Sequence, residues 1–318
     1  MTVSTKSMRD VFGKELAKMS LEDQRVVALD GDLGNSTRLA LVEKENPSSF
    51  LQMGIAEQNL VGVSAGLATC GMIPWACSFT AFITRRAFDQ LVVSVDQPKL
   101  NVKLVGSYSG LLTSNTGKTH HSFEDIALMT SLPNMLVFSP GDAKEVQRIM
   151  KAMNQYDGPA YLRLSRDEGV DFLDESDEEF VIGKAKWLKR GENRDRVACL
   201  STGAMSPRVK RALERLEAEG ILITHVHFPT LKPLDERTII DLAHNHKHLI
   251  TIEEHYVRHG FGSLVNEVTS SKRPVKTTRI GIQNEYSECG KNEELLDMHG
   301  LSPEKLAAKI KDIVEGER

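Results

Sequence analysis

The chain has 318 residues, of which 40% are apolar and 26% are charged, and it carries a net charge of −4 with a pI of about 6.2. Its length predicts two domains of ordinary size, and its composition excludes a disordered or collagen-like chain. The sequence contains no run of five or six basic residues, so we expect it to bind neither nucleic acid nor an anionic membrane.

The first residues, MTVSTKSMRDVFGKE, lack the apolar core of a signal peptide, and 18 apolar residues never occur together. The four cysteines form no CxxC pair and lie mostly beside apolar or small residues, as reduced thiols do. We therefore expect a cytoplasmic protein without disulfides.

Runs rich in β-branched residues alternate with helical patterns through the first half of the chain. The expected strands lie at residues 26–29, 73–77, 101–106, 135–139 and 160–164. This alternation predicts an α/β fold with a doubly wound parallel sheet and helices on its faces.

Local chemistry indicates three helix starts. Asp142 and Glu145 match a capping box, and the pairs Ser206-Pro207 and Ser302-Pro303 each place a cap before a first-turn proline. The last of these helices would present one apolar stripe to the core, formed by Leu306, Ile310, Ile313 and Val314.

The stretch DEGVDFLDESDEE, at residues 167–179, is too acidic for a core and has no helical stripe, so it predicts a linker. We expect one domain at residues 1–172, a linker at 173–185 and a smaller α/β domain at 186–318. Strands of the second domain are expected at residues 197–202, 221–228 and 248–254.

One acidic residue, Glu57, stands at the start of an apolar helical pattern in MGIAEQNLVG. Such a carboxyl group is either a helix cap or a group kept from water for chemistry. The same pattern contains Gly62 and Gly66 among other small residues. Because glycine costs a helix about 1 kcal/mol relative to alanine, we expect a close contact with another helix, within the subunit or across a subunit interface.

Further along, Phe79 and Phe82 are three residues apart, a spacing that most often marks core packing. A polar loop of about 15 residues then holds His120 and His121, and loops of that length in compact α/β domains are usually functional. A second set of histidines has no metal-ligand spacing and is assigned to a solvated helix end: His244, His246 and His248. GxGxxG, P-loop and GxSxG motifs do not occur in the sequence.

Several segments together resemble the C-terminal half of a transketolase, and most closely the second subunit of a split transketolase. In family order they are GIAEQ (54–58), FTAFITRRAFDQ (79–90), TGKTHH (116–121), EDIALMTSLPNM (124–135), LSR (164–166) and TIEEH (251–255). The resemblance implies a pyrimidine-binding domain of the thiamine-diphosphate type, followed by a smaller transketolase C-terminal domain.

By this resemblance, Glu57 would hydrogen-bond a nitrogen of the coenzyme's aminopyrimidine ring and favour the tautomer that removes the thiazolium proton. Phe82 would stack on the pyrimidine and Phe79 would line its pocket, which replaces the core interpretation given above. His120 matches the family histidine that contacts the donor sugar, where it could stabilise an alkoxide or move a proton.

Arg9, Ser36 and Arg166 match family positions that bind the terminal phosphate of the substrate. Their alternative roles are structural, since Arg9 could be a surface helix residue and Arg166 could pair with the acidic linker. Asp32 matches a family aspartate near the cofactor and the subunit interface, and its alternative role is to cap the helix after Ser36.

The chain departs from the family in the polar loop, which usually reads H-(seven residues)-D-G-x-T-H. Tyr108 and Thr116 occupy the histidine and aspartate positions of that pattern. Because those family residues contact the hydroxyls and phosphate of the sugar, their replacement implies a modified substrate that is branched, deoxy or sulfonated.

Transketolases hold the coenzyme diphosphate and Mg²⁺ through a GDG motif followed by an asparagine, and this sequence contains no GDG. The resemblance therefore implies an N-terminal transketolase subunit that carries this motif, and an α2β2 heterotetramer of the two chains. We expect no metal ligand in this chain.

The implied activity is transfer of a two-carbon ketol unit from a ketose to an aldose phosphate, by a transferase that is active only with its partner. The β subunit of a 2-oxo acid dehydrogenase and a deoxyxylulose-phosphate-synthase-like enzyme are alternatives, because they share the fold and the glutamate. A third possibility is a non-catalytic paralogue that lost its activity when Tyr108 and Thr116 replaced the family residues. Retained Glu57, Phe82 and His120 favour the transketolase.

Overall fold

The structure is a computed structural model that describes residues 7–113, 115–166, 180–191 and 196–316. Its first sheet contains seven strands: β1 (Val26–Asp30), β2 (Phe50–Gln52), β3 (Ile73–Phe79), β4 (Lys103–Ser107), β5 (Leu136–Phe138), β6 (Ala160–Leu164) and β10 (Thr230–Lys232). Their order is β10-β5-β6-β4-β3-β1-β2, and every neighbouring pair is parallel except β10 with β5.

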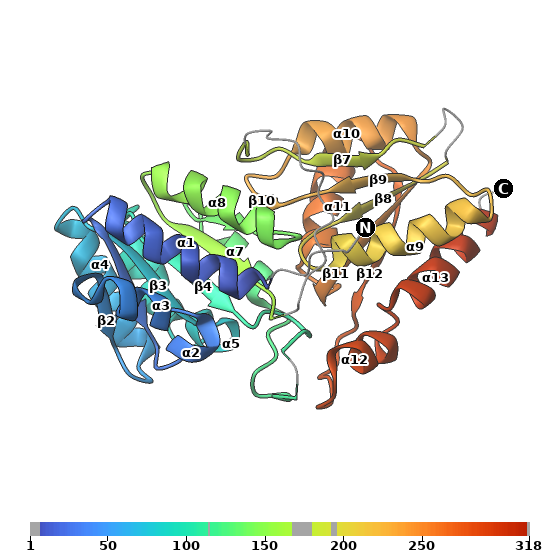
Figure 1. Cartoon of the computed structure of the whole chain (residues 1–318). Coiled ribbons are helices and arrows are strands. Elements are labelled where there is room, and N and C mark those ends of the chain that lie inside the picture. Colours follow the sequence, from blue (N-terminus) through green and yellow to red (C-terminus); the bar gives the residue numbers. More distant parts are fainter. Residues whose placement is uncertain (1–6, 114, 167–179, 192–195, 317–318) are drawn as a thin grey trace.

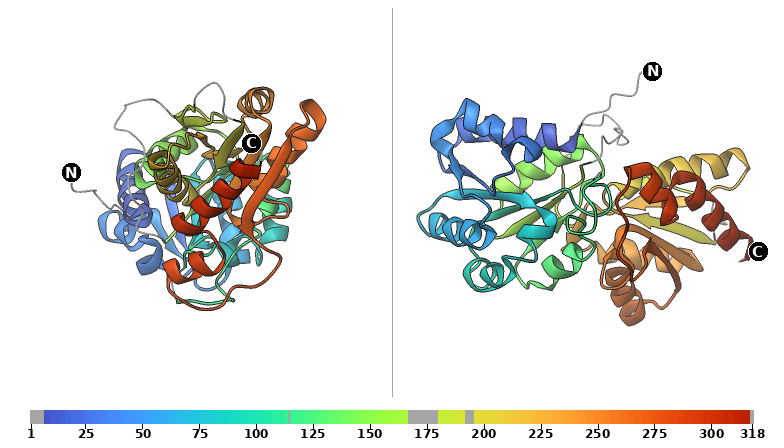
Figure 2. Two further views of the ribbon diagram at one scale, coloured as in Figure 1. Left: turned by 90° about the vertical axis from the view of Figure 1, so that its right-hand side faces the viewer. Right: turned by 90° about the horizontal axis from the view of Figure 1, so that it is seen from below.

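The second sheet contains five strands: β7 (Lys186–Lys189), β8 (Val197–Ser201), β9 (Thr224–His227), β11 (His248–Tyr256) and β12 (Lys276–Ile282). Their order is β12-β11-β8-β9-β7, and only β7 and β9 pair in the antiparallel direction. The two sheets lie side by side with helices on their faces, as Figures 1 and 2 show. The α/β class predicted from the sequence is confirmed.

Helices cover both faces of the first sheet. They are α1 (Met8–Glu22), α2 (Gly34–Thr37), α3 (Ala40–Glu45), the 3₁₀ turn η1 (Pro47–Ser49), α4 (Glu57–Thr69), α5 (Thr80–Ile83), α6 (Phe88–Gln90), the π-helix η2 (Leu91–Asp96), α7 (Asp125–Ser131) and α8 (Ala143–Gln155). Residues of α1 and α8 pack on one face around Trp75, while α4, η2 and α7 pack on the other around Leu104.

The second sheet is covered by α9 (Met205–Ala218), α10 (Glu236–Asn245), α11 (Phe261–Lys272), α12 (Asn292–Met298) and α13 (Pro303–Gly316). The face packed by α10 and α11 joins the core of the first sheet in one apolar cluster, in which Phe228 and Phe261 lie 5.2 Å apart between ring centres. In the described part of the chain, no helix has the length and apolar character needed to cross a bilayer.

The helix starts follow the sequence expectations only in part. Asp142 caps α8 by accepting from the Glu145 N–H, but the Glu145 carboxylate accepts from Gly141 and not from the cap residue. The expectation for Ser206 is wrong, because α9 begins one residue earlier, at Met205, and the Ser206 hydroxyl bonds to His227. Ser302 does accept from the Lys305 N–H at 3.4 Å, as a cap before Pro303 would.

The residues of the acidic stretch that predicted the linker, 167–179, lie outside the described residues. Phe180 and Ile182, which follow them, pack against the core of the first sheet, and the Phe180 ring meets Phe138 edge-on at 6.1 Å. The domain boundaries proposed from the sequence stay a prediction. The chain crosses between the two sheets once more at β10, which pairs with β5 at the edge of the first sheet.

Buried charged groups also join the two halves. Arg163 of β6 donates from Nε to Asp125 Oδ2 and from Nη2 to the Glu254 carbonyl of β11, both at 2.8 Å. Tyr161 donates its hydroxyl to the same Asp125 oxygen at 2.9 Å. Because Arg163 and Asp125 are almost fully buried, each charge depends on the other for compensation.

We predict that Arg163→Met lowers the free energy of unfolding by about 3–5 kcal/mol, because Asp125 would stay buried without its cation. Urea unfolding followed by circular dichroism would measure the loss. Lys18→Met is the matched control, since it removes an exposed pair with Glu22 and should leave the free energy of unfolding unchanged. A loss as small as that of the control would show that Arg163 does not carry this role.

Candidate active site

The residues singled out in the sequence converge where β1, β3 and β4 end. These three strands are neighbours and parallel, so their carboxyl ends meet at one edge of the sheet, where ligands of α/β proteins bind. Glu57, the first residue of α4, is completely buried there. Its Oε1 accepts from Ser78 Oγ of β3 at 2.8 Å, and its Oε2 pairs with Arg86 Nη1 at 2.5 Å. The carboxylate is thus bonded by one side chain of β3 and by one from the turn after α5.

Arg86 is a member of this site that the sequence analysis missed. Its guanidinium carbon lies 4.9 Å from the centre of the Phe82 ring, so it contacts both Glu57 and an aromatic of the site. Arg85, its neighbour, pairs instead with Glu124 at 3.2 Å. The available signal was the position of Arg86 four residues after Phe82, one helical turn away.

Four rings form a cluster next to Glu57. Phe79 stacks on Tyr108 with ring centres 4.1 Å apart and lies 6.0 Å from Phe82. His120 meets Phe82 and Phe79 edge-on, at 5.3 and 6.0 Å. Phe79 and Tyr108 are buried, whereas Phe82 and His120 are half-buried and can present a ring face or edge to a ligand.

Two arginines approach the Tyr108 ring. The guanidinium carbons of Arg9 and Arg166 lie 5.4 and 4.9 Å from its centre. Arg9 also donates from Nη1 to Tyr108 Oη at 3.0 Å and to the Ser36 carbonyl at 2.7 Å. Burial lowers the pKa of Arg9, Tyr108 opposes this, and the nearby cations Arg38 and Arg166 lower it further. Two guanidinium groups gathered at one ring favour the binding of an anion there.

The interpretation of Arg9 as a surface helix residue is wrong, because its side chain points into this cluster and is partly buried. Arg166 Nη1 donates to the Thr113 carbonyl at 3.3 Å. Its proposed pairing with the acidic linker falls on residues outside the described part of the chain.

Asp32 and Ser36 lie on the connection from β1 through α2. Asp32 is exposed, has a positive φ of 65°, and donates its N–H to Gln52 Oε1 at 3.1 Å. The capping role weighed for Asp32 is wrong, because α3, the helix after Ser36, begins at Ala40 without a side-chain cap bond. Asp30 Oδ2 instead accepts from the N–H groups of Leu33 and Gly34 at 3.0 Å, at the start of α2. Burial raises the pKa of Asp30, and the hydrogen bonds from Gln52 and from the two backbone N–H groups oppose this rise.

The polar loop that follows β4 brings His120 to the aromatic cluster, whereas the bonds of Thr116 lie within the loop. Thr116 Oγ1 donates within the loop, to Thr113 Oγ1 at 2.8 Å and to its carbonyl at 3.2 Å. His120 Nδ1 bonds Thr119 Oγ1 at 2.8 Å. Among the residues that the structure describes, no hydrogen bond is formed by His120 Nε2, so this atom can meet a ligand beside the aromatic cluster.

The next residue, His121, is buried and stacks on Phe123 with ring centres 5.3 Å apart. Neither of its ring nitrogens has a hydrogen-bond partner among the described residues. Burial, followed by the proximity of His299 and His120, lowers the pKa of His121 to about 4. The ring is therefore neutral at pH 7 and anchors the end of the loop.

The helix after Glu57 does not make the close contact expected within the subunit. Gly62 and Gly66 are exposed, and a Cβ atom at either position would meet no heavy atom within 4 Å. Ile55, just before α4, is also 73% exposed. The expectation is wrong for this chain by itself, and only its alternative, a contact across a subunit interface, stays a prediction.

The assignment of the later histidines to a solvated helix end holds for His244, which is exposed at the end of α10. It is wrong for His248, which is buried in β11 and bonds Thr278 Oγ1 at 2.8 Å. Among the residues described, no group of three histidine, cysteine or acidic side chains could hold a metal ion. All four cysteines are free.

Comparison with known proteins places both halves of the chain in the same family. Residues 4–170 match the transketolase pyrimidine-binding domain, and residues 183–306 match the transketolase C-terminal domain. A protein of Methanocaldococcus jannaschii named as a transketolase C-terminal section is 37% identical, over 98% of each chain. The 6-deoxy-6-sulfo-D-fructose transketolase subunit SqwH of Clostridium sp. (strain MSTE9) is 34% identical, over 97% of this chain and 94% of that protein.

Human transketolase is 32% identical over 96% of this chain, which spans only 49% of that longer protein. Among solved structures, a split-gene transketolase described as an inactive β4 tetramer superposes with a TM-score of 0.87 at 37% identity, over 99% of this chain and all of that one.

The buried neutral ring of His121 predicts an acid-sensitive stability. Between about pH 7 and pH 5 the unfolded chain takes up a proton near the ordinary histidine pKa of about 6.5, whereas the folded chain does not until about pH 4. The wild type should therefore lose stability relative to His121→Phe as the pH falls through this range.

Urea unfolding of both proteins at several pH values measures this difference, and phenylalanine keeps the stacking on Phe123. His244→Gln serves as the control, because that ring is exposed in the folded and unfolded states alike. Parallel pH profiles for wild type and His121→Phe would contradict the prediction.

Proposed function

The chain belongs to the transketolase family, and we propose that it is the C-terminal-half subunit of a split transketolase. In this proposal it transfers a two-carbon ketol unit from a ketose to an aldose phosphate. The observation that carries the proposal is the buried Glu57 carboxylate beside the half-open aromatic cluster at the strand ends. A flat ring that stacks on Phe82 and turns a nitrogen toward Glu57 would fit this arrangement.

Thiamine diphosphate, on which the family generally depends, carries such a ring at its aminopyrimidine end. When bound, the coenzyme supplies the nucleophilic carbon that attacks the ketose carbonyl. Each carboxylate oxygen accepts about two hydrogen bonds, so Ser78 and Arg86 leave Glu57 with acceptor capacity for a ring N–H. Arg86 would then act as a positioning residue that fixes the carboxylate from the side of Phe82.

The opposite side of the cluster suits the sugar. His120 presents a half-buried imidazole next to Phe82, where it could stabilise a developing alkoxide or move a proton. Arg9 and Arg166 converge on Tyr108, and their planar donors match the oxygens of a terminal anion. Ser36 would assist through its carbonyl, which already holds Arg9 in place.

We propose that the diphosphate and Mg²⁺ are held by a separate N-terminal transketolase subunit that carries the GDG motif. Three observations support this: the sequence has no GDG, the described residues contain no three-ligand cluster, and two relatives matched over nearly their whole length are a transketolase C-terminal section and a split-gene transketolase. The exposed face of α4 with Gly62 and Gly66 is available for such a partner. An α2β2 assembly would then complete two sites.

The modified substrate inferred from Tyr108 and Thr116 gains support from one relative, whose name specifies a 6-deoxy-6-sulfo-D-fructose transketolase. A sulfonate is an anion that two guanidinium groups could bind as they bind a phosphate. We therefore propose a ketose with a terminal sulfonate as the first donor to test, with an ordinary ketose phosphate as its competitor.

A second candidate function rests on a different relative. The 1-deoxy-D-xylulose-5-phosphate synthase 1 of Geobacter metallireducens is 34% identical over 98% of this chain and 49% of that protein.

One assay separates the candidate functions. The purified chain is mixed with its N-terminal partner, thiamine diphosphate and Mg²⁺, and is assayed with ketose donors, with pyruvate and with a lipoyl-bearing domain. Ketol transfer supports the proposal, pyruvate or lipoyl turnover supports an alternative enzyme, and inactivity despite bound coenzyme supports a non-catalytic paralogue.

In the assembled enzyme, Glu57→Gln should lower kcat at least about 100-fold while leaving assembly intact, because the proton-sharing group is lost and its bulk is kept. Steady-state kinetics and size-exclusion chromatography measure the two effects. Glu15→Gln is the matched control, a buried glutamate on α1 that bonds Gln147 away from the cluster and should keep normal turnover. Near-normal rates for Glu57→Gln would rule out the assigned role.

The double variant Tyr108→His/Thr116→Asp restores the family pattern in the loop. We predict that it raises the ratio of kcat/KM for fructose 6-phosphate over that for 6-deoxy-6-sulfo-D-fructose by at least about tenfold, since a site that hydrogen-bonds a substrate discriminates strongly. Competition between the two donors measures the ratio. If the folded double variant had the same ratio of kcat/KM values as the wild type, the inference of a modified sugar would be wrong.

A further inference from the structure

The loop that carries the sugar-side residues, residues 108–122, begins in an unfavourable backbone conformation. We call it the substrate loop. Tyr108 has a φ of 57° and Gly110 a φ of 68°, both in the left-handed region. A tyrosine rarely adopts this region and persists there only when its surroundings hold it. The start of the substrate loop therefore needs an external anchor.

Glu254 of β11 supplies that anchor from the second sheet. Its Oε1 accepts from the N–H groups of Leu111 and Leu112, the latter at 2.6 Å. Two bonds on the first-sheet side complete the turn, from Ser109 N to the Leu164 carbonyl and from Gly110 N to the Ser122 carbonyl. Four successive backbone amides after Tyr108 are thus fixed, two of them by one carboxylate.

The approach of Glu254 to the loop is too close for a side chain at position 110. A Cβ atom on Gly110 would lie 2.5 Å from Glu254 Oε1 and 2.8 Å from Arg163 Nη2. Glycine is therefore required here by contact as well as by its φ. Glu254 is buried, so it contacts the loop without competition from water.

The tip of the substrate loop meets the same half of the chain at a second place. Lys118 Nζ pairs with Glu288 Oε1 at 2.7 Å, and Cys289 Sγ donates to the Asn115 carbonyl at 3.2 Å. Both partners lie just before α12, toward which the loop extends in Figure 1. Thr116 and His120 lie close to these contacts in the sequence, so the second half of the chain holds the start and the tip of the loop that bears them.

We propose that the C-terminal half of the chain positions the substrate loop and that Glu254 is its principal positioning residue. The kinetic consequence rests on the proposed function, because Tyr108, Thr116 and His120 act on the sugar only if the chain is a transketolase subunit. The role belongs to the acceptor atom Oε1, since Oε2 has no hydrogen-bond partner among the described residues. A glutamine could therefore replace Glu254, with its carbonyl oxygen in the place of Oε1.

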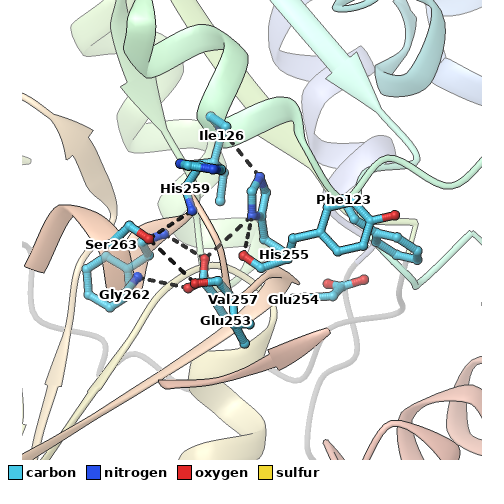
Figure 3. A network of polar contacts seen from close by, with 12 residues as sticks. Phe123, Ile126, Glu253, Glu254, His255, Val257, His259, Gly262 and Ser263 are labelled. Carbon is cyan, nitrogen blue, oxygen red and sulfur yellow. Dashed lines mark hydrogen bonds and ion pairs between the residues drawn. The ribbon is translucent and has the colours of Figure 1, made fainter. Parts of the chain in front are cut away.

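The adjacent residue, Glu253, provides a matched control. It is equally buried and also accepts two backbone N–H bonds, from Phe261 at 2.6 Å and from Gly262 at 2.8 Å. Because successive strand residues point to opposite faces, Glu253 caps the start of α11 while Glu254 points away from it, as Figure 3 shows. Loss of Glu253 thus perturbs the same strand without touching the substrate loop.

Hydrogen exchange measured by mass spectrometry tests the positioning without any assay of activity. In Glu254→Met, peptides covering residues 109–113 should exchange at least about tenfold faster than in the wild type, because two amides lose their acceptor. In Glu253→Met the faster exchange should appear at residues 261–262 and not in the loop. Glu254→Gln should stay within about threefold of the wild type.

Equal protection of residues 109–113 in wild type and Glu254→Met would overturn the proposal, and so would a loss in Glu254→Gln as large as that in Glu254→Met. If the assembled enzyme transfers ketol units, Glu254→Met should also lower kcat/KM for the donor at least about tenfold at equal folded protein, with Glu253→Met within about threefold of wild type. Equal kinetic losses in the two variants would overturn the kinetic part alone. Absence of ketol transfer in the wild type would contradict the proposed function and leave the exchange result standing.

Discussion

The buried carboxylate of Glu57 is the group on which the arrangement of the candidate site depends. A carboxylate without water is tolerated only with hydrogen-bond and charge partners, and here Ser78 and Arg86 provide them. Ser78 belongs to β3, and Arg86 follows the short helix that continues from that strand. The hydrogen bonds of the Glu57 carboxylate therefore fix the start of α4 against the end of β3. They also place Phe79 and Phe82 beside that carboxylate.

The second organising feature is a chain of buried polar groups between the two sheets. Asp125, Arg163 and Glu254 are linked through side-chain and backbone bonds, and Glu254 then holds the backbone that follows Tyr108. Glu145 and His227 form a further buried pair across the same junction, 2.8 Å apart. The sugar side of the site is consequently tied to the second half of the chain. The Glu57 side is built from α4, β3 and the turn after α5, all in the first half.

Sequence patterns predicted the fold class and most of the central strands, because parallel strands carry continuous apolar runs. The family motifs predicted the clustered residues, because these motifs include the residues at the strand ends. The sequence patterns did not reach the short edge strands β2, β7 and β10, which have too few residues for a periodic pattern. Arg86 and Glu254 were also missed as site residues, since each acquires its role through a partner 29 or 142 positions away. The spacing of Arg86 from Phe82 indicates a contact with that ring but not the bond to Glu57. His248 was misplaced because strand pairing with β8 and β12, and not its own neighbours, decides its burial.

The central claim is that this chain supplies the pyrimidine half of a coenzyme site whose diphosphate half lies on another polypeptide. A structure of the assembled complex with thiamine diphosphate and Mg²⁺ tests it most directly, through the separation of the Glu57 carboxylate and the pyrimidine ring nitrogen. The account predicts a hydrogen bond of about 2.7–2.9 Å there, with the diphosphate and metal bound by the partner. A Glu57 side chain turned away from the ring, or a coenzyme enclosed entirely by one polypeptide, would contradict it.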